Sequence, residues 1–225
     1  MTLLYGMPFS PFSQRVLIAA RLKGHDLDVA PPLGGAIQSD EFAAIAAMRR
    51  IPVLSDGDWS LCESAAIVAY LDETLDGPPL YPDTPKGRAR CRQVEGIVDG
   101  EVGAGLRHFA LNRMFCVYDI PDRLSYGRDQ VAQGLAALEH IGIGAGDGFA
   151  ISPEPGAADA ALVPVLAFAQ MMTDHFDGGP LIVGVPKVEA YWARAQDHPV
   201  MARSIAAMAG VVPVIMARRK AVARG

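Results

Sequence analysis

A cluster of four prolines between Gly77 and Pro85 constrains the fold of this chain more than any other feature. Proline lacks the N–H that a helix interior needs and its ring clashes with the preceding turn, so no helix runs straight through this stretch. Before it, short apolar runs alternate with helical patterns, whereas after it almost no strand pattern remains. We therefore expect an α/β domain at residues 1–77, a linker at 78–86 and an all-helical domain at 87–225.

The first domain has the element order β-α-β-α-β-β-α, which predicts a mixed sheet with helices on both faces. Its expected elements are the strand Thr2–Gly6, the helix Pro11–Lys23, the strand Asp26–Ala30, the helix Ser39–Met48, the strands Pro52–Leu54 and Trp59–Leu61, and the helix Ser64–Leu75. The helices expected in the second domain are Gly87–Asn112, Arg128–Ile141, Ala157–His175, Pro186–Ala195 and Met201–Ala209.

Composition and charge argue against several broad classes of function. The 20 basic and 25 acidic residues give a net charge of −5, which does not suit a general nucleic-acid binder. The longest apolar run, Ala160–Ala169, is about half of what a membrane span needs. Three cysteines without a CxxC, and no basic residue before the first apolar run, predict free thiols in a cytoplasmic protein. The five histidines lack the spacing of metal ligands, so we expect no metal.

Three short motifs each allow a structural and a functional interpretation. Ser10-Pro11 is a good helix start by itself, but a hydroxyl at a helix N-terminus can also stabilise a bound anion such as a thiolate. Ile51-Pro52 is consistent with an edge-strand proline, or with a cis turn that leaves the Ile51 backbone free to pair with an extended peptide. Glu63-Ser64 either caps the next helix or holds a ligand ammonium and a ligand carboxylate.

Together, the order and spacing of these motifs resemble the cytosolic glutathione transferase superfamily. The resemblance rests on Ser10-Pro11-Phe12-Ser13-Gln14-Arg15-Val16, on Arg50-Ile51-Pro52-Val53-Leu54, and on Leu61-Cys62-Glu63-Ser64 with the helix after it. The resemblance covers residues 1–80 and is closest to the serine-type classes tau, phi and zeta. The residues of the motifs themselves are most similar to those of the tau class. The resemblance implies a thioredoxin-like first domain with a mixed four-stranded sheet, an all-helical second domain, and a homodimer.

The resemblance also implies roles for individual residues. Ser10 would hydrogen-bond the glutathione sulfur, and Ile51, ahead of a cis Pro52, would pair with the cysteinyl backbone. Glu63 and Ser64 would hold the γ-glutamyl end. The glycyl carboxylate would lie near two further side chains, Arg50 and Gln38, the latter standing where the family often has Lys or His.

The function that we expect from this resemblance is a detoxifying glutathione transferase. A glutathione thiolate, activated by Ser10, would attack an apolar electrophile in a pocket to which Phe12, Phe109 and Arg113 contribute. One alternative keeps the fold and changes the reaction to isomerisation, dehalogenation, ether cleavage or peroxide reduction. Phe12 stands where zeta-class isomerases carry a cysteine, which disfavours isomerisation. Another alternative is a non-catalytic protein that binds ligands or a partner.

Overall fold

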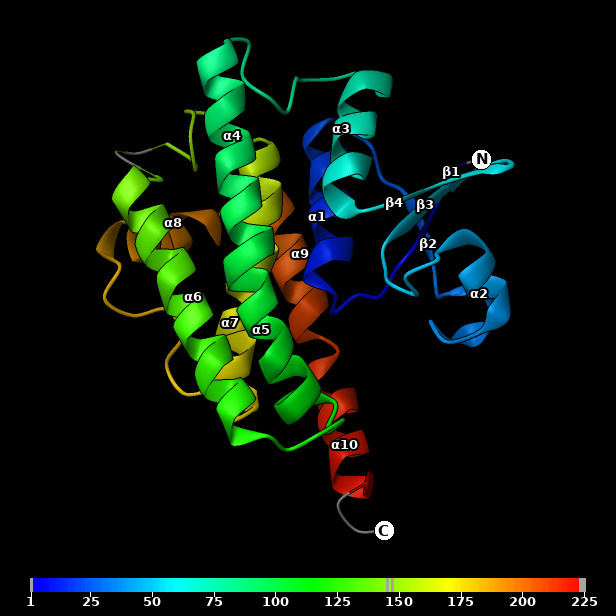
Figure 1. Cartoon of the computed structure of the whole chain (residues 1–225). Helices are drawn as coiled ribbons and strands as arrows, with labels where there is room; N and C mark the ends of the chain where they lie inside the picture. Colours follow the sequence, from blue (N-terminus) through cyan, green and yellow to red (C-terminus); the bar gives the residue numbers. More distant parts are fainter. Residues whose placement is uncertain (1, 145, 147, 223–225) are drawn as a thin grey trace.

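The computed structural model describes residues 2–144, 146 and 148–222, and its first part is a four-stranded mixed sheet with helices (Figure 1). The strands lie in the order β2-β1-β3-β4, with β1 parallel to β2 and antiparallel to β3, and β3 antiparallel to β4. The elements are β1 (Thr2–Tyr5), α1 (Pro11–Leu22), β2 (Asp28–Ala30), the short turn η1 (Leu33–Gly35), α2 (Asp40–Ile45), β3 (Val53–Asp56), β4 (Trp59–Cys62) and α3 (Ser64–Thr74). The predicted fold class is confirmed.

Alternation along the strands decides which helices cover which face of the sheet. Leu4, Leu54 and Leu61 are register partners across β1, β3 and β4, and all three pack in the core that contains α1 and α3. Their neighbour Val53 points to the opposite face, where it packs with Phe42 of α2. Because successive side chains of a strand point to opposite sides, the sheet is covered by helices on both faces.

The second part of the chain is entirely helical among its described residues. A continuous helical run consists of α4 (Pro85–Ile97), the π-helical segment η2 (Val98–Gly103), α5 (Ala104–Phe109) and the π-helical segment η3 (Ala110–Met114). It is followed by α6 (Pro121–Ile141), α7 (Ala157–His175), α8 (Pro186–Ala195), α9 (Pro199–Ala209) and α10 (Val212–Val222). Most of α7 is buried, and α1 packs directly on it, so one hydrophobic core joins the two parts.

Some predicted boundaries differ from those in the structure. Pro85 and Lys86, assigned to the linker, lie in α4, because Thr84 accepts a hydrogen bond from the Gly87 N–H and caps the helix two residues earlier than predicted. Helix α6 begins at Pro121, seven residues before the predicted start, since proline suits the first helical position. The segment after α9 was not among the expected elements, and it forms the separate helix α10, which extends away from the bundle in Figure 1.

The segment Pro199–Arg219 is long and apolar enough, by composition, to cross a membrane. In the structure, however, α9 ends at Ala209 and packs against α1 and α7. Arg21 of α1 also donates a hydrogen bond to the Ser204 hydroxyl on the buried side of α9. These contacts bury one side of α9, at Met201, Ser204 and Met208, whereas 22% of the apolar window as a whole is buried within the fold.

Candidate functional site

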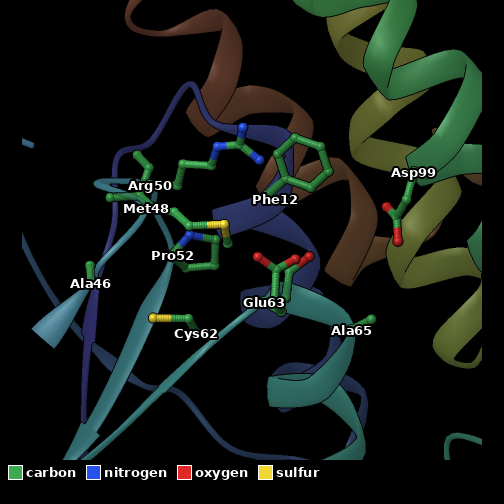
Figure 2. A pocket seen from close by; sticks show the side chains of 11 residues that line it. Phe12, Ala46, Met48, Arg50, Pro52, Cys62, Glu63, Ala65 and Asp99 are labelled. Carbon is green, nitrogen blue, oxygen red and sulfur yellow. The ribbon is translucent and has the colours of Figure 1, made fainter.

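A pocket of about 200 Å³ opens where the start of β3, the start of α3 and the first turn of α1 meet η2 (Figure 2). Its lining includes six of the residues singled out in the sequence, namely Phe12, Arg50, Ile51, Pro52, Glu63 and Ser64. It also includes residues without a predicted role, namely Ala46, Met48, Cys62, Ala65 and Asp99. The three motifs that are far apart in the sequence therefore contribute to one region.

The backbone before β3 has unused hydrogen-bonding capacity. The Ile51–Pro52 peptide bond is cis, as the second interpretation of that motif predicted. Within the described residues, neither the N–H nor the C=O of Ile51 makes a hydrogen bond, because the sheet ladder begins only at Val53. An extended peptide lying alongside Ile51 would find both a donor and an acceptor.

The start of α3 is suited to an anion. Ser64 is the first residue of this helix, is 7% exposed and lines the pocket, and the first turn carries no acidic side chain. The unpaired N–H groups and the positive end of the helix dipole there favour a carboxylate. Glu63 just before it has φ of 69°, a conformation that costs a non-glycine residue of order 1–3 kcal/mol. In Figure 2 its carboxylate points toward the same space.

Ser10 is two positions before Phe12, which lines the pocket, but Ser10 itself is not a lining residue. Its hydroxyl caps α1 by accepting a hydrogen bond from the Ser13 N–H at 3.3 Å, and the side chain is buried. This is the structural role of the motif. A serine hydroxyl that accepts from the backbone keeps its own O–H proton to donate, so the cap leaves the predicted role toward sulfur open.

Three other predicted site residues lie elsewhere. Gln38 is exposed and outside the pocket, and its backbone C=O accepts a hydrogen bond from the Arg49 guanidinium. Phe109 is 2% exposed in the core, where the Arg128 guanidinium lies over its ring at 5.6 Å. Arg113 lines a second pocket, at the end of η3.

An ion network that the sequence motifs did not indicate borders the first pocket at Asp99. Arg15 of α1 is 1% exposed and donates to both Asp99 carboxylate oxygens at 3.0 and 2.8 Å, and to Glu95 Oε1 at 2.7 Å. Burial alone would lower the pKa of Arg15, but the two carboxylates outweigh burial and raise it. The Tyr81 hydroxyl also donates to Glu95 at 3.1 Å. This network fixes Asp99, a wall of the pocket, to the helix that begins at Ser10.

Comparisons with known proteins show to which family this chain is similar. Residues 4–79 match the family model described as the N-terminal domain of glutathione S-transferase. Over 213 residues, which are 87% of this chain and 95% of the relative, the sequence is 32% identical to a maleylacetoacetate isomerase of Pseudomonas aeruginosa. The chain belongs to the glutathione S-transferase family. The mouse maleylacetoacetate isomerase is 27% identical over 82% of this chain and 86% of its own length.

Solved structures of this family have the same fold. A maleylacetoacetate isomerase from Methylobacterium extorquens, described with bound malonate and GSH, superposes with a TM-score of 0.74 at 27% identity, over 90% of this chain and 95% of the other. A maleyl pyruvate isomerase, described as a bacterial zeta-class glutathione S-transferase, superposes with a TM-score of 0.75 at 25% identity, over 91% and 97%. These relatives are named as isomerases, so they favour the isomerase alternative over a plain transferase.

Proposed function

We propose that this family member binds glutathione in the first pocket and uses it to isomerise a conjugated cis double bond next to a carboxylate or carbonyl group. The relatives named above act on maleyl compounds, in which a double bond of this kind is present. The observation that carries the proposal is the meeting of three groups in one pocket: the unpaired Ile51 backbone, the Glu63 carboxylate and the N-terminus of α3 at Ser64.

These groups match the chemistry of an extended γ-glutamyl peptide. Its cysteinyl backbone pairs with Ile51, and its γ-glutamyl carboxylate is held by the Ser64 hydroxyl and the N–H groups of α3. Glu63 takes the ammonium group. Arg50 is exposed beside the pocket and is free to meet the glycyl carboxylate, whereas Gln38 is the weaker part of the assignment because it lies outside the pocket.

The thiol has to be ionised to react, and a free thiol has a pKa near 8.5. Ser10 donates its O–H to the sulfur, and the N-terminus of α1 adds a positive potential. Each unit by which these groups lower the pKa of the sulfur corresponds to about 1.4 kcal/mol. When the thiolate adds to the conjugated double bond, the electron pair of that bond moves onto the neighbouring carbonyl or carboxylate group. The resulting single bond rotates, and return of the electron pair then expels the thiolate and restores the double bond.

Transfer of glutathione to an electrophile is the second candidate. Phe12 favours it, because an aromatic ring occupies the pocket wall where zeta-class isomerases carry a cysteine. The ring also lies close to the backbone of Gly103, where an added Cβ would be 3.3 Å from it. Phe12 therefore makes this wall of the pocket apolar and places no thiol at its own position, while Cys62 lines the pocket elsewhere.

Calorimetric titration with glutathione tests the binding step. We expect Ser64→Ala to weaken binding roughly tenfold to a hundredfold, as loss of one hydrogen bond to a carboxylate does. Ser125→Ala, at an exposed site near the start of α6, is the matched control and keeps the wild-type affinity. Absence of any heat with the wild-type protein would refute the proposal.

Turnover assays then separate the candidate reactions. Glutathione-dependent conversion of maleylacetoacetate to its trans isomer supports isomerisation, while conjugation of an aryl halide without isomerisation moves the assignment to transfer. Binding without either reaction supports a ligand-binding protein. In the active case, Ser10→Ala raises the pH at which the bound thiolate forms, and an unchanged pH profile removes Ser10 from its role.

A further inference from the structure

A second pocket, of about 240 Å³, lies between the end of η3, the chain leading to α6, and α10. None of its lining residues belongs to the lining of the first pocket. The lining residues are Asn112, Arg113, Cys116, Tyr118, Asp119 and Arg219. Every one of them is polar, charged or a thiol.

Several polar atoms of this lining lack partners. Asn112 is 4% exposed, yet within the described residues neither its amide nitrogen nor its amide oxygen makes a hydrogen bond. The same holds for the Arg113 Nε and the Tyr118 hydroxyl. An unsatisfied buried polar group costs about 1–3 kcal/mol, and such groups are rare in native proteins. Their gathering around one cavity indicates a polar ligand.

The charge of the lining indicates an anionic ligand. Arg113 and Asp119 are 3.9 Å apart, and Asp119 is largely exposed, so this pair neutralises little. Arg219 lies over the Phe176 ring at 5.5 Å and donates to the Met216 sulfur, and no described carboxylate pairs with it. Two guanidinium groups thus line the cavity together with one carboxylate, that of Asp119.

Cys116 is the most accessible thiol of the chain. It is exposed, and its only described contact is a weak 3.9 Å hydrogen bond from Sγ to the Arg113 carbonyl. Cys91 is fully buried, and burial raises its pKa to about 12. Burial also raises the pKa of Cys62, which lies in the first pocket. The other two thiols are therefore poorly placed to react with a solute near neutral pH.

We propose that Cys116 is a thiolation site for anionic disulfides, of which glutathione disulfide is the natural example, with Arg113, Arg219 and Asn112 binding the reagent. The Cys116 thiol loses its proton to solvent, and its sulfur attacks one sulfur of the disulfide. A new S–S bond forms, the old one breaks, and the departing thiolate takes up a proton. Cys116 is oxidised to a mixed disulfide and one thiol is released, so electrons and atoms balance.

The charge of the reagent provides the test. In a Cys62→Ser/Cys91→Ala background, Cys116 reacts with dithiobis(nitrobenzoate), a dianion, and with dithiodipyridine, which is uncharged. We expect Arg113→Gln combined with Arg219→Gln to slow the dianion roughly tenfold and to change the neutral reagent little. Arg218→Gln, at the exposed neighbouring position on α10, is the matched control and slows neither reagent.

Equal slowing of both reagents, or an equal effect of Arg218→Gln, would overturn the proposal. A second measurement avoids the thiol-free background: wild-type protein is treated with glutathione disulfide, digested and mapped by mass spectrometry. We expect the added glutathionyl group on Cys116, and first modification at Cys62 would contradict this. Cys116→Ser binds reduced glutathione in the first pocket as wild type does, so failure here is distinct from failure of the proposed function.

Discussion

Removing the Arg15 guanidinium tests whether the buried ion network holds the two parts of the chain together. Arg15→Met fills a similar volume but leaves Glu95, whose side chain is 7% exposed, with the Tyr81 hydroxyl as its one remaining partner among the described residues. Breaking a buried pair in this way costs about 3–5 kcal/mol. Asp99 is 37% exposed and adds little, because water screens it once the partner is gone.

Urea unfolding measures this loss directly. In thermal unfolding, each kcal/mol lost lowers the Tm of a chain of this size by about 2–4 °C, so the Tm should fall by roughly 6–20 °C. Arg15→Met/Glu95→Met is the informative control, because replacing both partners removes the uncompensated charge and restores most of the lost stability. A loss below about 1 kcal/mol in Arg15→Met, or a double variant less stable than the single one, would refute the reasoning.

Three further predictions concern packing, capping and pH. Gly105→Ala should destabilise the bundle by about 1–3 kcal/mol, because an added Cβ would lie 2.5 Å from the Gly127 carbonyl oxygen. Gly96→Ala should stabilise the protein by about 0.5–1 kcal/mol, because nothing lies within 4 Å of an added Cβ there. Urea titrations measure both changes. Asp159→Ala should cost about 3–6 kcal/mol of stability, because the carboxylate accepts hydrogen bonds from the Gly156 and Ala150 N–H groups and from the buried Tyr191 hydroxyl. A loss near 1 kcal/mol in calorimetry would contradict this role of Asp159. Burial lowers the pKa of His198, so the folded state disfavours the imidazolium, and the free energy of unfolding should fall as pH drops below about 6.5. His198→Gln should flatten this part of the plot of unfolding free energy against pH. An unchanged slope in that variant would contradict the assignment to His198.

Most of the fold could be predicted from local patterns in the sequence. The strand and helix order and the helix start at Ser10-Pro11 depend on residues a few positions apart, and these features are present in the structure. Helix starts were less reliable where proline opened the helix before any apolar period was evident, as at Pro121. The identity and spacing of three motifs were enough to bring six of the predicted site residues into one pocket.

The parts that could not be predicted depend on contacts between distant residues. Arg15 and Asp99 are 84 positions apart, and nothing in the residues around either one indicates the other. Arg113 was expected to contribute to the electrophile pocket from its position on the helix after Phe109, and in the structure it lines the second pocket together with Arg219. Arg219 lies on α10, a helix that was not among the expected elements.

One continuous helical run carries both pockets, and this determines how they relate. Asp99 lines the first pocket and Asn112 the second, and the two residues are thirteen positions apart along the helical run, which is at most about 20 Å at the α-helical rise of 1.5 Å per residue. The first end of the run is tied to α1 by Arg15. The second end touches the loop before α1, where the Phe115 and Phe9 rings lie 5.5 Å apart in an edge-on contact. A group attached at Cys116 therefore lies next to the aromatic contact that supports the Ser10 loop, while the Ser64 end of the first pocket is supported by other elements.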